Sequence, residues 1–116
     1  MNVKECYEAM SGDYEGVKGR LMTDERIKKF LLKVPQGEPI DEIVENLNNK
    51  DYETAFRNVH NMKGVALNLG LSVLANSSSD LCEALRGGEP SVDITPLLEQ
   101  LKKDYDKFIE LLGQID

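Results

Sequence analysis

The chain has 116 residues and a formal net charge of −7 at pH 7, with one histidine, two cysteines and no tryptophan. This length fits one ordinary domain, and the acidic balance argues against a nucleic-acid-binding surface, which needs clustered lysines and arginines. One histidine and two distant cysteines are too few for the usual zinc sites, so we expect no metal site.

The N-terminal third predicts two or three short helices within residues 1–35. One apolar stripe with helical spacing comprises Met10, Tyr14, Val17 and Leu21. Ser11 and Asp13 are both candidate caps for it. Thr23 is a typical N-cap residue, and a second apolar stripe follows it, made of Ile27, Phe30, Leu31 and Val34. We expect Pro35-Gln36-Gly37 to end this helix.

Four longer helical patterns follow. Pro39 opens the first, and Asp51 caps the second, which runs to about Leu69. The third runs from Leu71 to a stop at Gly87-Gly88, and the last begins at Asp93 or Thr95, with Pro96 in its first turn. Because short connections make successive helices antiparallel, the prediction is a single all-α domain. Residues 38–114 would form an up-down-up-down four-helix bundle, and the short helices of residues 1–35 would cover one end or groove.

The helix predicted over residues 51–69 has an unusual outer face. At about 100° per residue, its apolar core face comprises Ala55, Val59, Met62, Val65, Ala66 and Leu69. His60 points nearly opposite, with Phe56, Arg57, Lys63, Gly64 and Leu67 within about 60° of it. The N-terminal helices are one alternative cover for Phe56 or Leu67.

Gly64 is the residue on this face that is hardest to explain by packing. A glycine in mid-helix costs about 1 kcal/mol relative to alanine. Bare backbone one turn from His60 therefore indicates that another molecule approaches the imidazole closely. The nearby bases Arg57 and Lys63 favour an anion at this place.

His60-Asn61-Met62-Lys63-Gly64, followed by Gly70, resembles the H-x-x-K-G-x5-G pattern of histidine-containing phosphotransfer (HPt) domains. The resemblance implies that His60 exchanges a phosphoryl group with the aspartate of response-regulator receiver domains. It also implies that Lys63 stabilises the phosphoryl group and that Gly64 gives the receiver access. The implied docking surface comprises Phe56, Arg57, Asn61, Leu67 and Asn68, and Arg86 is a further candidate near the phosphoryl group.

The partners implied by the resemblance are receiver domains and an upstream sensor (hybrid) histidine kinase. The chain would need no cofactor of its own, because the receiver would supply Mg²⁺. It lacks a Gly-rich nucleotide loop, so we expect a phosphocarrier without kinase activity. A helical interaction module with an incidental His60 is the main alternative. A hydrolase with His60 as general base is a weaker one, because the same face offers no serine or cysteine nucleophile.

The lengths of the apolar runs bear on where in the cell we expect the chain. No apolar run in the chain has the length of a signal peptide or approaches the roughly 20 residues that span a bilayer. We therefore expect a cytoplasmic chain with reduced thiols, with Cys82 in the core. One well-covered bundle favours a monomer.

Overall fold

The computed structural model describes residues 1–116 and contains helices but no strands. The helices are α1 (Val3–Ala9), α2 (Tyr14–Leu21), α3 (Asp24–Gly37), α4 (Ile40–Asn48), α5 (Tyr52–Asn68), α6 (Ser72–Leu85) and α7 (Thr95–Leu112). The predicted all-α class is confirmed. None of these helices combines the length and apolarity needed to cross a bilayer.

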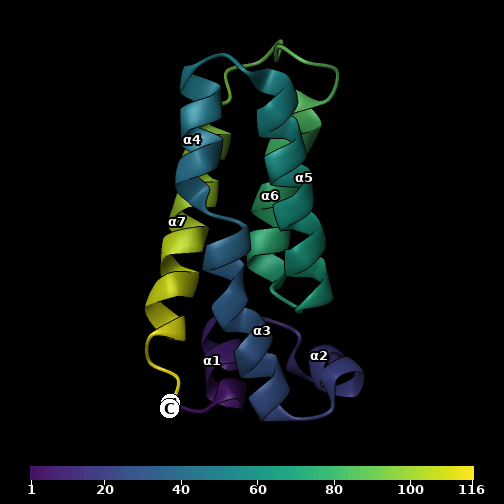
Figure 1. Ribbon diagram of the computed structural model, residues 1–116, viewed down its shortest axis with the longest axis vertical. Coiled ribbons are helices and arrows are strands. Elements are labelled where there is room, and N and C mark those ends of the chain that lie inside the picture. Colours follow the sequence, from purple (N-terminus) through teal and green to yellow (C-terminus); the bar gives the residue numbers. More distant parts are fainter.

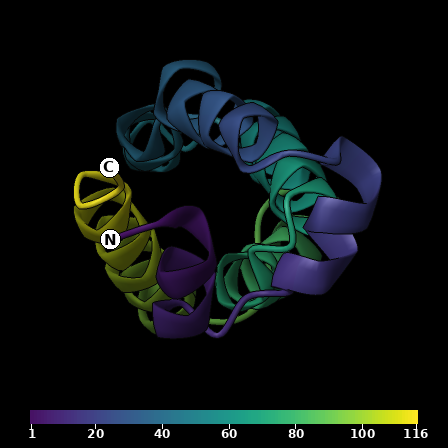
Figure 2. The same cartoon turned by 90° about the horizontal axis from the view of Figure 1, so that it is seen from below.

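Helices α4, α5, α6 and α7 lie side by side along the long axis and alternate in direction (Figure 1). Helix α3 continues below α4 on the same side of the molecule. Viewed from below, the long helices form a ring; α1 lies at its open end beside α7, and α2 lies outside it (Figure 2). The short N-terminal helices therefore gather at one end of the molecule.

Two of the longer helices start at side-chain caps that directly precede them in the chain. The Thr23 hydroxyl accepts a hydrogen bond from the Arg26 backbone N–H (3.2 Å) at the start of α3. The Asp51 carboxylate accepts one from the Thr54 backbone N–H (3.2 Å) at the start of α5. Each cap satisfies a donor that the helix itself leaves unpaired. Both predicted caps are thus confirmed.

Helix α3 ends at Gly37, within the predicted stop Pro35-Gln36-Gly37, although it passes through Pro35 first. Proline has a helical φ, and within the last turn its missing N–H removes only one intrahelical hydrogen bond. The hydrogen bond at the end of the helix is kept, since the Glu38 N–H donates to the Val34 carbonyl (2.8 Å). The N-terminal helical segment therefore extends past residue 35.

The predicted Met10–Leu21 stripe is divided between two helices. Met10 ends α1, Ser11 adopts a left-handed φ of 56°, and Asp13 is the cap of α2. The Asp13 N–H donates to the carbonyl of Gly70 (2.8 Å), far along the chain. A tertiary hydrogen bond therefore fixes this turn, and apolar spacing along the chain could not reveal it.

One continuous core joins both parts of the molecule. It includes the predicted inner face of α5, although Val65 is only partly buried. The Tyr7 hydroxyl donates to the Leu69 carbonyl (2.6 Å), and the Tyr105 hydroxyl donates to the Glu38 carbonyl (3.0 Å). Phe30 departs from the prediction and is 43% exposed. Cys82 is buried, as expected, and no disulfide forms.

Candidate functional site

His60 lies near the middle of α5 with its side chain exposed, whereas its neighbours Val59 and Met62 are buried. This arrangement confirms the orientation that the apolar spacing predicted. The helix begins at the Asp51 cap and presents a continuous apolar face to the core, so His60 is held at a fixed place on a regular surface.

Two side chains hold the imidazole ring. Phe56, one turn earlier on α5, stacks on it with 5.9 Å between ring centroids and 22° between planes. On α6, the Cys82 sulfur lies 4.0 Å from Nδ1 of His60. Nε2 of His60 has no hydrogen-bond partner within the chain, so it is the nitrogen available to another molecule.

Lys63 and Gly64 lie about one turn beyond His60. Lys63 is half-buried and takes part in none of the four ion pairs of the chain. A Cβ atom added at Gly64 would meet no heavy atom within 4 Å. The glycine therefore has no packing role inside this chain, and the ammonium of Lys63 has no carboxylate partner.

The predicted docking residues all lie on α5, but they differ in exposure. Leu67 is 57% exposed, and Arg57, Asn61 and Asn68 are exposed as well. Phe56 is half-buried beside Arg86 and belongs to the first half of α5, which starts at the opposite end of the molecule from α1 and α2 (Figure 1). The alternative of an N-terminal cover is thus wrong for both Phe56 and Leu67.

Arg86 lies on the Phe56 side of the site. Its guanidinium is 5.5 Å from the centre of the Phe56 ring and forms an ion pair with Glu83 (2.8 Å). This pairing lowers the pKa of the Glu83 carboxyl below its ordinary value. Arg86 is thus already engaged in two contacts, and its approach to a phosphoryl group stays a prediction.

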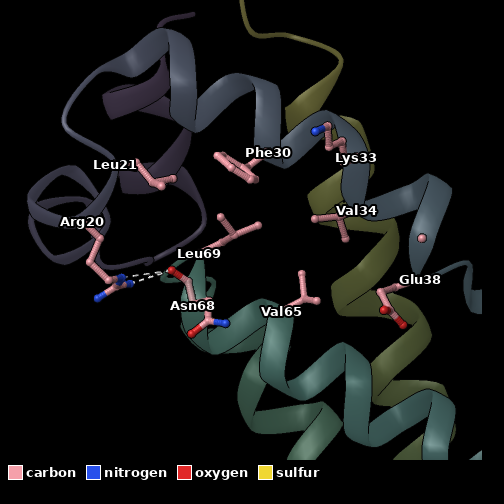
Figure 3. Close-up of a pocket in the computed structure, with 10 residues that line it drawn as sticks. Arg20, Leu21, Phe30, Lys33, Val34, Glu38, Val65, Asn68 and Leu69 are labelled. Atoms are coloured by element: carbon pink, nitrogen blue, oxygen red, sulfur yellow. Dashed lines mark hydrogen bonds between the residues drawn. The ribbon is translucent and has the colours of Figure 1, made fainter.

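A cavity of about 390 Å³ lies between α2, α3 and the C-terminal part of α5 (Figure 3). Leu21, Phe30 and Val65 are among its apolar walls. At its edge the Arg20 guanidinium donates two hydrogen bonds to the Asn68 carbonyl (3.2 and 2.7 Å). The N-terminal helices therefore border the predicted docking surface at Asn68.

Sequence reasoning missed two of these contacts. Arg20 and Asn68 are 48 residues apart, and no motif links them. Cys82 was expected in the core from its apolar stripe, but its contact with His60 depends on how α5 and α6 are aligned. No group of three or more His, Cys, Asp or Glu side chains is arranged to hold a metal ion.

Comparison with known proteins adds one finding. The family model of the Hpt domain matches residues 34–111, which is more than half of the chain. The matched range contains α4, α5, α6 and all the candidate site residues, and it leaves out α1 and α2. No curated protein and no solved structure matches the chain.

Proposed function

Because this chain belongs to the Hpt domain family, we propose that it relays a phosphoryl group on His60 between the aspartates of receiver domains. Hpt domains in general serve as phosphocarriers in two-component signalling and interact with its response regulators and kinases. The observation that supports the proposal best is the exposed imidazole of His60 beside the open backbone of Gly64.

The proposed step is an in-line displacement at phosphorus. The lone pair of Nε2 of His60 attacks the phosphoryl group of the receiver's acyl phosphate. The N–P bond forms, the P–O bond to the aspartate breaks, and the carboxylate leaves. The attacking ring is neutral with its proton on Nδ1, and the phosphorylated ring keeps that proton. The reverse step returns the group to an aspartate.

Two side chains of α5 would assist this transfer. The ammonium of Lys63, which has no carboxylate partner, would donate a charge-assisted hydrogen bond to a phosphoryl oxygen. The receiver would dock on Phe56, Arg57, Asn61, Leu67 and Asn68, and Gly64 would admit its active-site loops. Charge neutralisation by Mg²⁺ would come from the receiver.

Incubation with a receiver domain that carries a labelled phosphoryl group tests the proposal. The wild-type chain should gain acid-labile label, and His60→Gln should gain none, because the chain has no other imidazole. The variant should keep its helix content in circular dichroism, since residue 60 is exposed. ATP alone should label neither protein.

The same experiment separates the proposal from its main alternative. An interaction module without phosphotransfer would bind the receiver and remain unlabelled. Label that persists on His60→Gln would show that the phosphoryl group resides on another residue, and the assignment of His60 would then be wrong.

A further inference from the structure

The proposed phosphoryl transfer does not involve the buried thiol that lies beneath His60. Cys82 on α6 is fully buried, and its sulfur lies 4.0 Å from Nδ1 of His60. This is the one hydrogen-bonding contact that either side chain makes. Together with the Phe56 ring stacked on its face, the sulfur fixes which edge of the imidazole points into the protein.

The contact bears on reactivity because a neutral imidazole carries one proton on one of two nitrogens. Nε2 can attack phosphorus only when the proton is on Nδ1. A proton on Nδ1 points toward α6, and an acceptor there favours the Nδ1–H form over the Nε2–H form, because the hydrogen bond forms only in the first. The Cys82 sulfur is the acceptor that the structure provides.

The state of the thiol is consistent with this role. Burial raises the pKa of Cys82 above its ordinary value, although the positive charges of Lys63 and Arg86 oppose the rise. The sulfur is therefore a neutral, weak acceptor. By accepting a hydrogen bond from Nδ1–H, it can orient the ring and leave the lone pair of Nε2 free to attack.

We propose that Cys82 is a positioning residue for His60: its sulfur accepts a hydrogen bond from Nδ1–H and leaves Nε2 as the unprotonated nitrogen that faces the partner. This inference rests on the proposed function for the identity of the reaction. The geometry of the ring can be tested without any partner.

The single histidine makes the test direct. Nuclear magnetic resonance of histidine-labelled protein, at a pH where the ring is neutral, distinguishes the two tautomers by the shifts of the ring nitrogens. The wild-type chain should show mainly the Nδ1–H form. Cys82→Ala should shift the ring toward the Nε2–H form, and Cys82→Ser, which keeps an acceptor, should lie nearer the wild type.

Cys6→Ala is the matched control, because Cys6 is also fully buried but lies on α1. It should leave the tautomers unchanged. A wild-type spectrum dominated by the Nε2–H form would show that the thiol donates to the ring instead, and the inference would be wrong. It would also be wrong if Cys82→Ala kept the wild-type ratio, or if Cys6→Ala changed the ratio equally.

A second measurement links the tautomer to chemistry. Phosphoramidate serves as a small phosphoryl donor, and the product is identified by phosphorus resonance. The wild type should be modified on Nε2, and Cys82→Ala should react roughly two- to fivefold more slowly, in proportion to its smaller competent fraction. Modification on Nδ1, or equal rates, would contradict the inference.

The two proposals can fail separately. If the wild type shows the Nδ1–H tautomer but accepts no phosphoryl group from any receiver, the proposed function fails and the ring geometry stands. If receivers label His60 while Cys82→Ala changes neither tautomer nor rate, the positioning role alone fails.

Discussion

Lys63 and Arg57 are both basic residues near His60 on α5, but their surroundings differ. Arg57 lies 3.6 Å from the Glu53 carboxylate, whereas Lys63 has no such partner. Lys63→Ala should therefore slow transfer from a phosphorylated receiver and shorten the lifetime of the phosphorylated state. A charge-assisted hydrogen bond is worth roughly 1.5–3 kcal/mol, so about ten- to a hundredfold in rate is expected.

Quenched-flow labelling measures the Lys63→Ala effect, and Lys103→Ala is its control. The control removes an exposed cation without an ion pair from α7, outside the predicted docking surface, so it should alter the transfer rate much less. Equal effects of the two variants would indicate that general surface charge matters, and the specific role of Lys63 would then be wrong.

Substitutions at Gly64 distinguish the access of the receiver from the stability of the helix. Its Cβ position is open, so Gly64→Gln should stabilise the helix, by up to about 1 kcal/mol in urea unfolding. It should nevertheless weaken transfer, because a long side chain stands where the receiver approaches. Gly64→Ala should stabilise similarly with a smaller effect on transfer. Normal transfer by Gly64→Gln would contradict the access argument.

At the scale of single residues, the sequence predicts the features that depend on the geometry of one helix alone. The spacing of α5 predicts the exposure of His60 and Gly64, because both follow from the angle per residue. The contacts of His60 with Cys82 and of Phe56 with Arg86 join two helices. They depend on the rotation and register of α6 against α5, which apolar spacing leaves open.

At the scale of the element, the carboxylate of Asp24 holds the junction between α2 and α3. The Tyr14 hydroxyl (2.6 Å) and the Lys18 ammonium (2.9 Å) both donate to Asp24. These hydrogen bonds hold the pKa of the Asp24 carboxyl below its ordinary value. The ionised form therefore stabilises the fold above about pH 4, and this stabilisation disappears as the pH falls through the folded-state pKa.

Asp24→Asn should accordingly lower the urea midpoint at about pH 7, and its difference from the wild type should shrink toward about pH 2.5. Glu25→Gln is the control, since Glu25 lies in the same helical turn and forms no ion pair. A loss with Asp24→Asn that is independent of pH would show that the carboxylate charge is not the cause.

Helix starts were predicted correctly where a cap residue directly precedes the helix. Asp51 and Thr23 mark the starts of α5 and α3, because each cap bonds a backbone N–H three residues away. Asp13, one of the two predicted cap candidates, is the N-cap of α2. Its hydrogen bond to Gly70 links distant residues, so apolar spacing could not predict it. Helix α3 ends within the predicted stop Pro35-Gln36-Gly37, and it continues through Pro35 because a proline in a last turn removes only one hydrogen bond.

At the scale of the whole molecule, Tyr7 connects the N-terminal helices to the bundle. It is fully buried, and its hydroxyl donates to the carbonyl of Leu69 at the end of α5. Tyr7→Phe should lower the free energy of unfolding by roughly 1–2 kcal/mol, because a buried hydrogen bond is lost. Equilibrium urea unfolding measures the change.

Tyr52→Phe is the matched control for Tyr7→Phe, because the Tyr52 hydroxyl has no hydrogen-bond partner within the chain and the side chain is half-buried. It should change stability by much less. Equal destabilisation by both variants would mean that the hydrogen bond of the Tyr7 hydroxyl does not stabilise the packing of the N-terminal helices on the bundle.

The two side chains that hold the His60 ring, Phe56 and Cys82, both come from the pair formed by α5 and α6. These helices form one antiparallel hairpin and are separated only by residues 69–71. Closing so short a segment of chain costs little entropy, and its contacts are local. If His60 carries the proposed phosphoryl group, its immediate surroundings would therefore be independent of the N-terminal helices. Changes in α1, α2 or α3 would then reshape the border at Arg20 and Asn68, and with it the choice of partner, without altering the contacts of the imidazole.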